Sequence, residues 1–133
     1  MEIVENKICL DTQFLVDLLN NKKYAVDFIS EAEGQSIIGV SIITIFELFH
    51  GAYLHKNIKQ LALIEELCSR LNILNLSQEI VKESGKISAE LVKSGKMIEF
   101  RDILIGVSAK VHDYCLKTKN VKHFNRIDGL EIL

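Results

Sequence analysis

Residues 7–19 read KICLDTQFLVDLL, and the change of pattern at Asp11 indicates the fold class. The four residues before Asp11 are mostly apolar, which is typical of a short strand buried within a sheet. The residues after it place Phe14, Leu15 and Leu18 at the spacing of one helix face. Because the strand and the helix follow each other directly, we expect a chain in which the two kinds of element alternate.

The rest of the sequence continues this alternation. We expect further strands at residues 36–40, 72–76, 114–117 and 130–133, and further helices at residues 24–32, 41–51, 58–71 and 102–111. A long helix should begin after Ser77, a residue type favoured as an N-cap, and stop at Gly95. Strands that alternate with helices predict a single α/β domain over residues 1–133, with helices on both faces of a central parallel sheet.

The composition is that of an ordinary folded protein. Of the 133 residues, 48% are hydrophobic and 26% are charged, which argues against disorder. No apolar run approaches the roughly 18 residues of a membrane-spanning helix, so we expect a cytoplasmic protein with no membrane partner. The three cysteines show no CxxC spacing, which argues against a zinc site.

The net charge of −2 does not mark a nucleic-acid-binding protein, but one segment is locally basic. Between Lys110 and Arg126 stand five lysines or arginines and one acid, Asp113. Such a segment either holds phosphates beside an active site or forms a solvated face, and both interpretations remain open.

Three carboxylates stand at the boundaries of the predicted elements, and each has a purely structural alternative. Asp11 could cap the helix that follows it. Glu47 lies among isoleucine, phenylalanine and leucine, where a buried carboxylate needs a metal ion or a cation as partner, unless it lies on the helix surface. Asp102 could cap its helix or pair with the adjacent Arg101.

The predicted topology brings these residues together. In a parallel α/β sheet, ligands bind beyond the carboxyl ends of the strands, where Asp11, Glu47, Asp102 and the later Asn120 should meet. Clustered carboxylates are the ligands that Mg²⁺ and Mn²⁺ prefer. Two such ions roughly 3.5–4 Å apart activate a water and stabilise the leaving oxygen in phosphodiester cleavage. This chemistry does not by itself select a substrate.

Four blocks of the sequence resemble the motifs of PIN-domain nucleases. They are LDTQFLVDLL at residues 10–19, SIITIFELFHG at 41–51, DILIGVSA at 102–109 and LKTKNVKHF at 116–124. The blocks occur in the order and at the separations of the family, and they span nearly the whole chain. The length and the closing Thr-x-Asn pattern are most similar to VapC-type toxins of toxin–antitoxin pairs.

This resemblance implies a three-layer α/β/α fold and a Mg²⁺- or Mn²⁺-dependent endoribonuclease that hydrolyses RNA with a metal-activated water. It implies Asp11, Glu47 and Asp102 as metal ligands, with Asn120 at a fourth catalytic position where many relatives carry aspartate. Thr12 and Thr118 would hold these ligands. Relatives form homodimers, and a small VapB-like antitoxin inserts a basic side chain into their acidic crevice.

Two other functions remain open on the sequence. One is a PIN-like RNA-binding or RNA-maturation domain with weakened or absent catalysis, favoured by the neutral Asn120 and by Arg101 beside Asp102. The other is a nuclease that acts on DNA.

Overall fold

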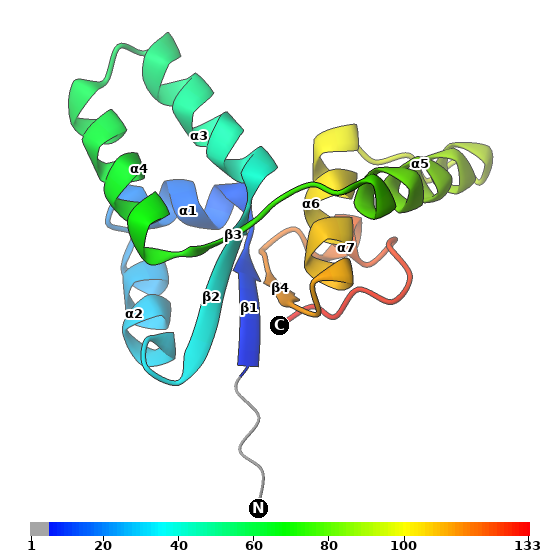
Figure 1. Cartoon of the computed structure of the whole chain (residues 1–133), viewed down its shortest axis with the longest axis horizontal. Coiled ribbons are helices and arrows are strands. Elements are labelled where there is room, and N and C mark those ends of the chain that lie inside the picture. The colour runs from blue at the N-terminus through cyan, green and yellow to red at the C-terminus, as the bar shows by residue number, and fades with distance from the viewer. Residues whose placement is uncertain (1–5) are drawn as a thin grey trace, which may run out of the picture.

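The computed structural model describes residues 6–133 (Figure 1). The predicted domain of residues 1–133 also includes residues 1–5, which lie outside the described residues. The elements are β1 (Asn6–Leu10), α1 (Thr12–Leu19), α2 (Lys23–Ala32), β2 (Ser36–Ser41), α3 (Ile42–Leu54), α4 (Ile58–Arg70), β3 (Asn72–Leu74), α5 (Gln78–Lys93), α6 (Phe100–Val111), β4 (Cys115–Lys117) and α7 (Val121–Phe124).

The four strands form one parallel sheet in the order β3-β2-β1-β4. Figure 1 shows α1 to α4 on one side of this sheet and α5 to α7 on the other. Each face has its own apolar core, and the strand residues alternate between the two: Ile8 and Leu10 join the cluster under α1 to α4, whereas Cys9 joins the other. The predicted α/β/α fold with a central parallel sheet is confirmed.

Helix α5 begins and ends at the predicted residues. The Ser77 hydroxyl accepts a hydrogen bond of 3.2 Å from the backbone N–H of Ile80, as an N-cap does. Gly95 lies just beyond the helix with a positive φ of 70°, a conformation that glycine adopts without steric cost. Within residues 6–133, none of the helices is both long enough and apolar enough to cross a membrane.

Several predicted elements differ from the structure. The strand expected at residues 130–133 is a single bridge between Leu116 and Ile132, because a turn at Gly129 immediately precedes it. The strand expected at residues 72–76 ends at Leu74, and the short helix α7 was not predicted. Helix α6 begins at Phe100, so Asp102 lies in its first turn and is not its N-cap.

Candidate metal and active site

The candidate site lies where the connection between neighbouring strands changes direction. From β1 the chain builds outward to β2 and β3, and it then returns to place β4 on the other side of β1. The loops after β1 and β4 therefore diverge at the carboxyl edge of the sheet, which is where open α/β sheets bind their ligands. Asp11 follows β1 directly, and Thr118 follows β4 directly.

Both oxygens of Asp11 have hydrogen-bond donors. Oδ1 accepts a bond of 2.8 Å from the backbone N–H of Phe14, so Asp11 does cap α1, as the structural alternative predicted. Oδ2 accepts the hydroxyl of Thr118, whose oxygen also accepts the backbone N–H of Asn120 at 2.9 Å. Burial raises the pKa of Asp11 above its usual value, although these two donors lower it. The cap leaves Oδ2 facing the β4 loop, where Thr118 holds it.

Glu47 is held from the neighbouring helix. It lies on α3, half-buried, and its Oε1 accepts a hydrogen bond of 2.7 Å from the hydroxyl of Thr12. Thr12 also contacts the hydroxyl of Thr44 at 3.0 Å, and Thr44 is fully buried one turn before Glu47. Thr44 was not singled out in the sequence. Its three-residue spacing from Glu47, on the same helix face, was the signal available.

Asp102 is the third predicted carboxylate, and it comes from α6 on the opposite side of the sheet. We call Asp11, Glu47 and Asp102 together the acidic edge. It is half-buried on α6, and its pKa is raised by burial, then by the charges of Glu99 and Glu47, and also by Asp11, while His123 lowers it. The charges of Glu47 and Asp11 thus both act on Asp102. Arg101 does not form the predicted pair with Asp102, because its Nε donates to Glu99 at 2.5 Å.

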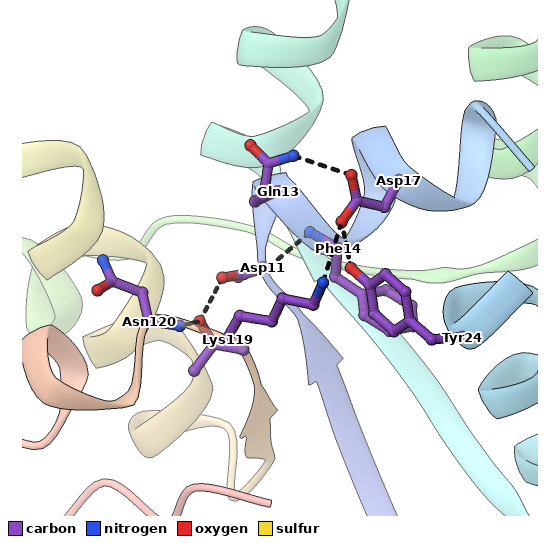
Figure 2. A network of polar contacts seen from close by, with 8 residues as sticks. Asp11, Gln13, Phe14, Asp17, Tyr24, Lys119 and Asn120 are labelled. Carbon is purple, nitrogen blue, oxygen red and sulfur yellow. Dashed lines mark hydrogen bonds and ion pairs between the residues drawn. The ribbon is translucent and has the colours of Figure 1, made fainter. Parts of the chain in front are cut away.

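Asn120 reaches the site through its backbone. Its N–H binds Thr118, but its side chain is paired with His123, with 3.0 Å between Nδ2 and Nδ1 of the imidazole. Figure 2 shows the carboxamide of Asn120 turned away from Asp11. Its role as the fourth catalytic residue stays a prediction.

The donor set suits a hard divalent cation. The partners of Asp11 and Glu47 are hydroxyls and a backbone N–H, which orient the carboxylates without neutralising them. Negative charge is therefore left for a cation to balance, and oxygen ligands select Mg²⁺-like ions. Among residues 6–133, no three His, Cys, Asp or Glu side chains lie close enough together to hold an ion as they stand.

A second polar network, which sequence reasoning missed, lies beside Asp11 (Figure 2). Its centre is Asp17, a buried carboxylate on α1 that accepts the hydroxyl of Tyr24 and a bond of 3.0 Å from Gln13 Nε2. These two donors and the positive charges of Lys119 and Lys22 lower its pKa, the Tyr24 hydroxyl most. The signal available was an aspartate inside the apolar run FLVDLL.

Comparison with known proteins agrees with this geometry. The family model of the PIN domain matches residues 8–130. Ribonuclease VapC1 of Methanocaldococcus jannaschii is 34% identical over 134 aligned residues, which cover 99% of this chain and 90% of that protein.

Two solved structures are similar over almost their full length. VapBC2 from Rickettsia felis, bound to a DNA fragment from its promoter, matches with a TM-score of 0.87 and 26% identity over 96% of this chain and 97% of that one. A toxin-antitoxin complex from Klebsiella pneumoniae matches with a TM-score of 0.74 and 28% identity over 92% and 94%. The chain therefore belongs to the PIN domain family, among the VapC ribonucleases.

Proposed function

We propose that this protein is a metal-dependent endoribonuclease whose cation, Mg²⁺ or Mn²⁺, is held by Asp11, Glu47 and Asp102. One observation carries the proposal: Asp11 and its neighbour Thr12, which holds Glu47, stand at the carboxyl end of β1, and hydroxyl and backbone N–H donors hold both carboxylates. The charges of Glu47 and Asp11 both act on Asp102 of α6. PIN-domain ribonucleases generally need a divalent metal, and this set of oxygen ligands is of the kind that such a metal binds.

The protein's own residues orient the ligands. Thr118 fixes Oδ2 of Asp11, and Thr12 fixes Oε1 of Glu47, so each carboxylate presents a defined direction to the edge of the sheet. The bound cation would supply a nucleophilic water at neutral pH and stabilise the negative charge that develops on the cleaved phosphate. The half-buried position of Asp102 strengthens its attraction for the cation.

We further propose that the nuclease is the toxin of a type II toxin–antitoxin pair and acts in the cytoplasm as a homodimer. A small VapB-like antitoxin would neutralise the acidic edge with a basic side chain. Support for a dimer comes from large apolar side chains left exposed on α3 and α4, namely Phe46 at 60%, Tyr53 at 66%, Leu54 at 65% and Ile58 at 81%. The test is co-purification with the product of a small reading frame next to the gene, followed by the mass of the complex in solution.

The nuclease activity is tested by incubating a mixed RNA pool that includes transfer RNA with the protein and Mg²⁺, Mn²⁺ or EDTA. We expect cleavage with either metal and none with EDTA. Asp11→Asn should abolish cleavage, whereas Asp27→Asn should not, because Asp27 pairs with Lys23 on the exposed face of α2. Cleavage in EDTA would contradict the metal mechanism, and a fully active Asp11→Asn variant would contradict the site.

The alternative of a PIN-like RNA-binding domain without catalysis predicts a different result in the same assay. Such a protein would bind the RNA pool but cleave none of it with any metal. One of the two features that favoured this alternative is weakened, because Arg101 pairs with Glu99 and not with Asp102.

A further inference from the structure

Lys119 extends from the loop after β4 toward α1 and α2, as Figure 2 shows. Its ammonium nitrogen lies 3.7 Å from the ring centroid of Tyr24 and 4.0 Å from Oδ2 of Asp17. The residue before it, Thr118, holds Asp11. Two consecutive residues of this loop are therefore attached to α1 and its cap, and the cation of Lys119 stands beside the acidic site.

The position of this cation is built from rigid parts. The Tyr24 ring packs edge-on against buried Phe14, with 5.8 Å between the ring centroids, and the Tyr24 hydroxyl binds Asp17. Asp17 is itself buried in α1 and is held by a second donor, Gln13. A ring face and a fixed carboxylate together attract an ammonium group and limit its movement.

This arrangement limits the movement of the Lys119 ammonium group but does not bring it within hydrogen-bond distance of Asp17. The nitrogen lies 4.0 Å from Asp17, longer than the roughly 2.7–2.9 Å of a charge-assisted hydrogen bond. The exposed pair between Lys23 and Asp27, by contrast, closes to 2.7 Å. The Lys119 side chain is 65% exposed, so N–H donors of its ammonium group remain directed at solvent.

Two of the other four basic residues between Lys110 and Arg126 are paired away from the site, and Lys117 lies over the ring of Phe28. Lys110 pairs with Glu83 on α5 at 3.4 Å, and Arg126 donates to the carbonyls of Lys96 and Met97. Lys119 instead stands next to Thr118 and Asp11, where a polyanionic substrate would meet an acidic surface. A fixed cation at that rim offsets the repulsion between the carboxylates and the phosphates.

We propose that Lys119 is a substrate-binding residue that contacts a backbone phosphate of RNA next to the acidic site, and that Tyr24 and Asp17 are the residues that position it. The proposal rests on the proposed ribonuclease function. It goes beyond that function by naming a residue that contacts the RNA. Lys119 of the β4–α7 loop, positioned by Asp17 of α1 and Tyr24 of α2, would align the RNA strand relative to Asp11.

The test measures binding in the non-cleaving Asp11→Asn background. A fluorescently labelled single-stranded RNA is titrated with protein at several salt concentrations, and the slope of log affinity against log salt is determined. Each phosphate contact contributes about 0.7 to this slope for a single strand. We expect Lys119→Gln to reduce the slope by about 0.7 and the affinity about fivefold at moderate salt. Lys119→Arg should restore most of both.

Two further variants distinguish a specific phosphate contact from a general effect of positive charge and test the role of the Tyr24 ring. Lys86→Gln removes an exposed charge on α5, which packs against α6, and should leave the slope unchanged. Tyr24→Leu retains the charge of Lys119 but removes the ring that holds it, so affinity should fall while most of the slope remains. Thermal melting of every variant identifies any loss of binding that comes from unfolding.

The failures of the two proposals are distinguishable. If the wild-type protein cleaves RNA and Lys119→Gln keeps the parental slope and affinity, the role of Lys119 is wrong and the ribonuclease function stands. If the wild-type protein does not cleave RNA and the Asp11→Asn parent does not bind it, both proposals are wrong. A slope that falls equally in Lys86→Gln and Lys119→Gln also overturns the specific contact.

Discussion

Replacing Thr118 with valine should weaken both the fold and the activity, because the Thr118 hydroxyl makes two hydrogen bonds at the site. It donates to Oδ2 of Asp11 and accepts the backbone N–H of Asn120 at 2.9 Å. Thr118 is 6% exposed, so water does not readily replace either bond. Valine has nearly the same shape without the hydroxyl, so the substitution removes the bonds and leaves the packing almost unchanged.

The magnitude follows from the two bonds. A hydrogen bond to a charged group contributes about 1.5–3 kcal/mol and a neutral one about 1 kcal/mol, so the free energy of unfolding should fall by about 2.5–4 kcal/mol. The unfolding entropy of about 2.1 cal/mol/K per residue gives about 0.28 kcal/mol/K for 133 residues. The expected fall in Tm is therefore about 9–14 °C.

Activity should respond separately. The Thr118 bond lowers the pKa of Asp11, so its loss raises that pKa further and keeps the carboxyl protonated to a higher pH. The acid side of the pH–activity profile should move to higher pH, and cleavage at neutral pH should fall about 10- to 100-fold, as when a group that orients a metal ligand is removed.

The assay pairs Thr118→Val with Thr118→Ser, which keeps the hydroxyl. Tm is measured without metal, and cleavage is measured from acid to neutral pH with Mg²⁺. Serine should remain close to the wild type in both. A valine variant that melts within about 2 °C of the serine variant and cleaves RNA with the wild-type pH profile would contradict the predicted role of the Thr118 hydroxyl.

Three further substitutions test other parts of the structure. Burial and the charges of Glu99 and Glu47 raise the pKa of Asp102 above its ordinary 3.8, so the folded state binds more protons and the free energy of unfolding falls as pH rises through that range. Asp102→Asn removes this loss of unfolding free energy. In urea titrations without divalent metal, the variant should be more stable than the wild type at pH 7 but no more stable at pH 3. Tyr24→Phe deletes the hydroxyl that binds buried Asp17; thermal melting should show a loss of about 1.5–3 kcal/mol, and RNA binding should persist because the ring that holds Lys119 remains. Ser77→Ala removes the N-cap of α5 and should lower the free energy of urea unfolding by about 1 kcal/mol, with no effect on cleavage.

Local pattern was sufficient to predict most of the fold. The periodicity of β1 and α1, the cap at Ser77 and the glycine at 95 are properties of neighbouring residues, and the structure confirms them. The start of α6 is less marked, because Glu99 precedes the helix without a side-chain cap hydrogen bond. The prediction therefore placed the first residue of that helix at Asp102, two residues too late.

The partners of the charged residues depended on geometry that the sequence shows only in part. Arg101 pairs with Glu99, which precedes α6 in an extended conformation, so this pair forms across the helix start and helical spacing alone does not predict it. The network of Asp17 was beyond local reasoning. Its partners Tyr24 and Lys119 come from the next helix and from a distant loop, and only the fold brings them together.

The carboxylates of Asp11 and Glu47 are hydrogen-bonded to neutral groups and not to the nearby cations. Thr12 and Thr118 orient Glu47 and Asp11 with neutral hydroxyls. Two nearby cations are attached to other acids, since Arg101 pairs with Glu99 and Lys119 lies against Asp17. A structural ion pair at Asp11 or Glu47 would stabilise the apo protein but compete with a metal ion for the same oxygens. The arrangement instead tolerates carboxylates with raised pKa values, a cost in stability that metal binding would offset.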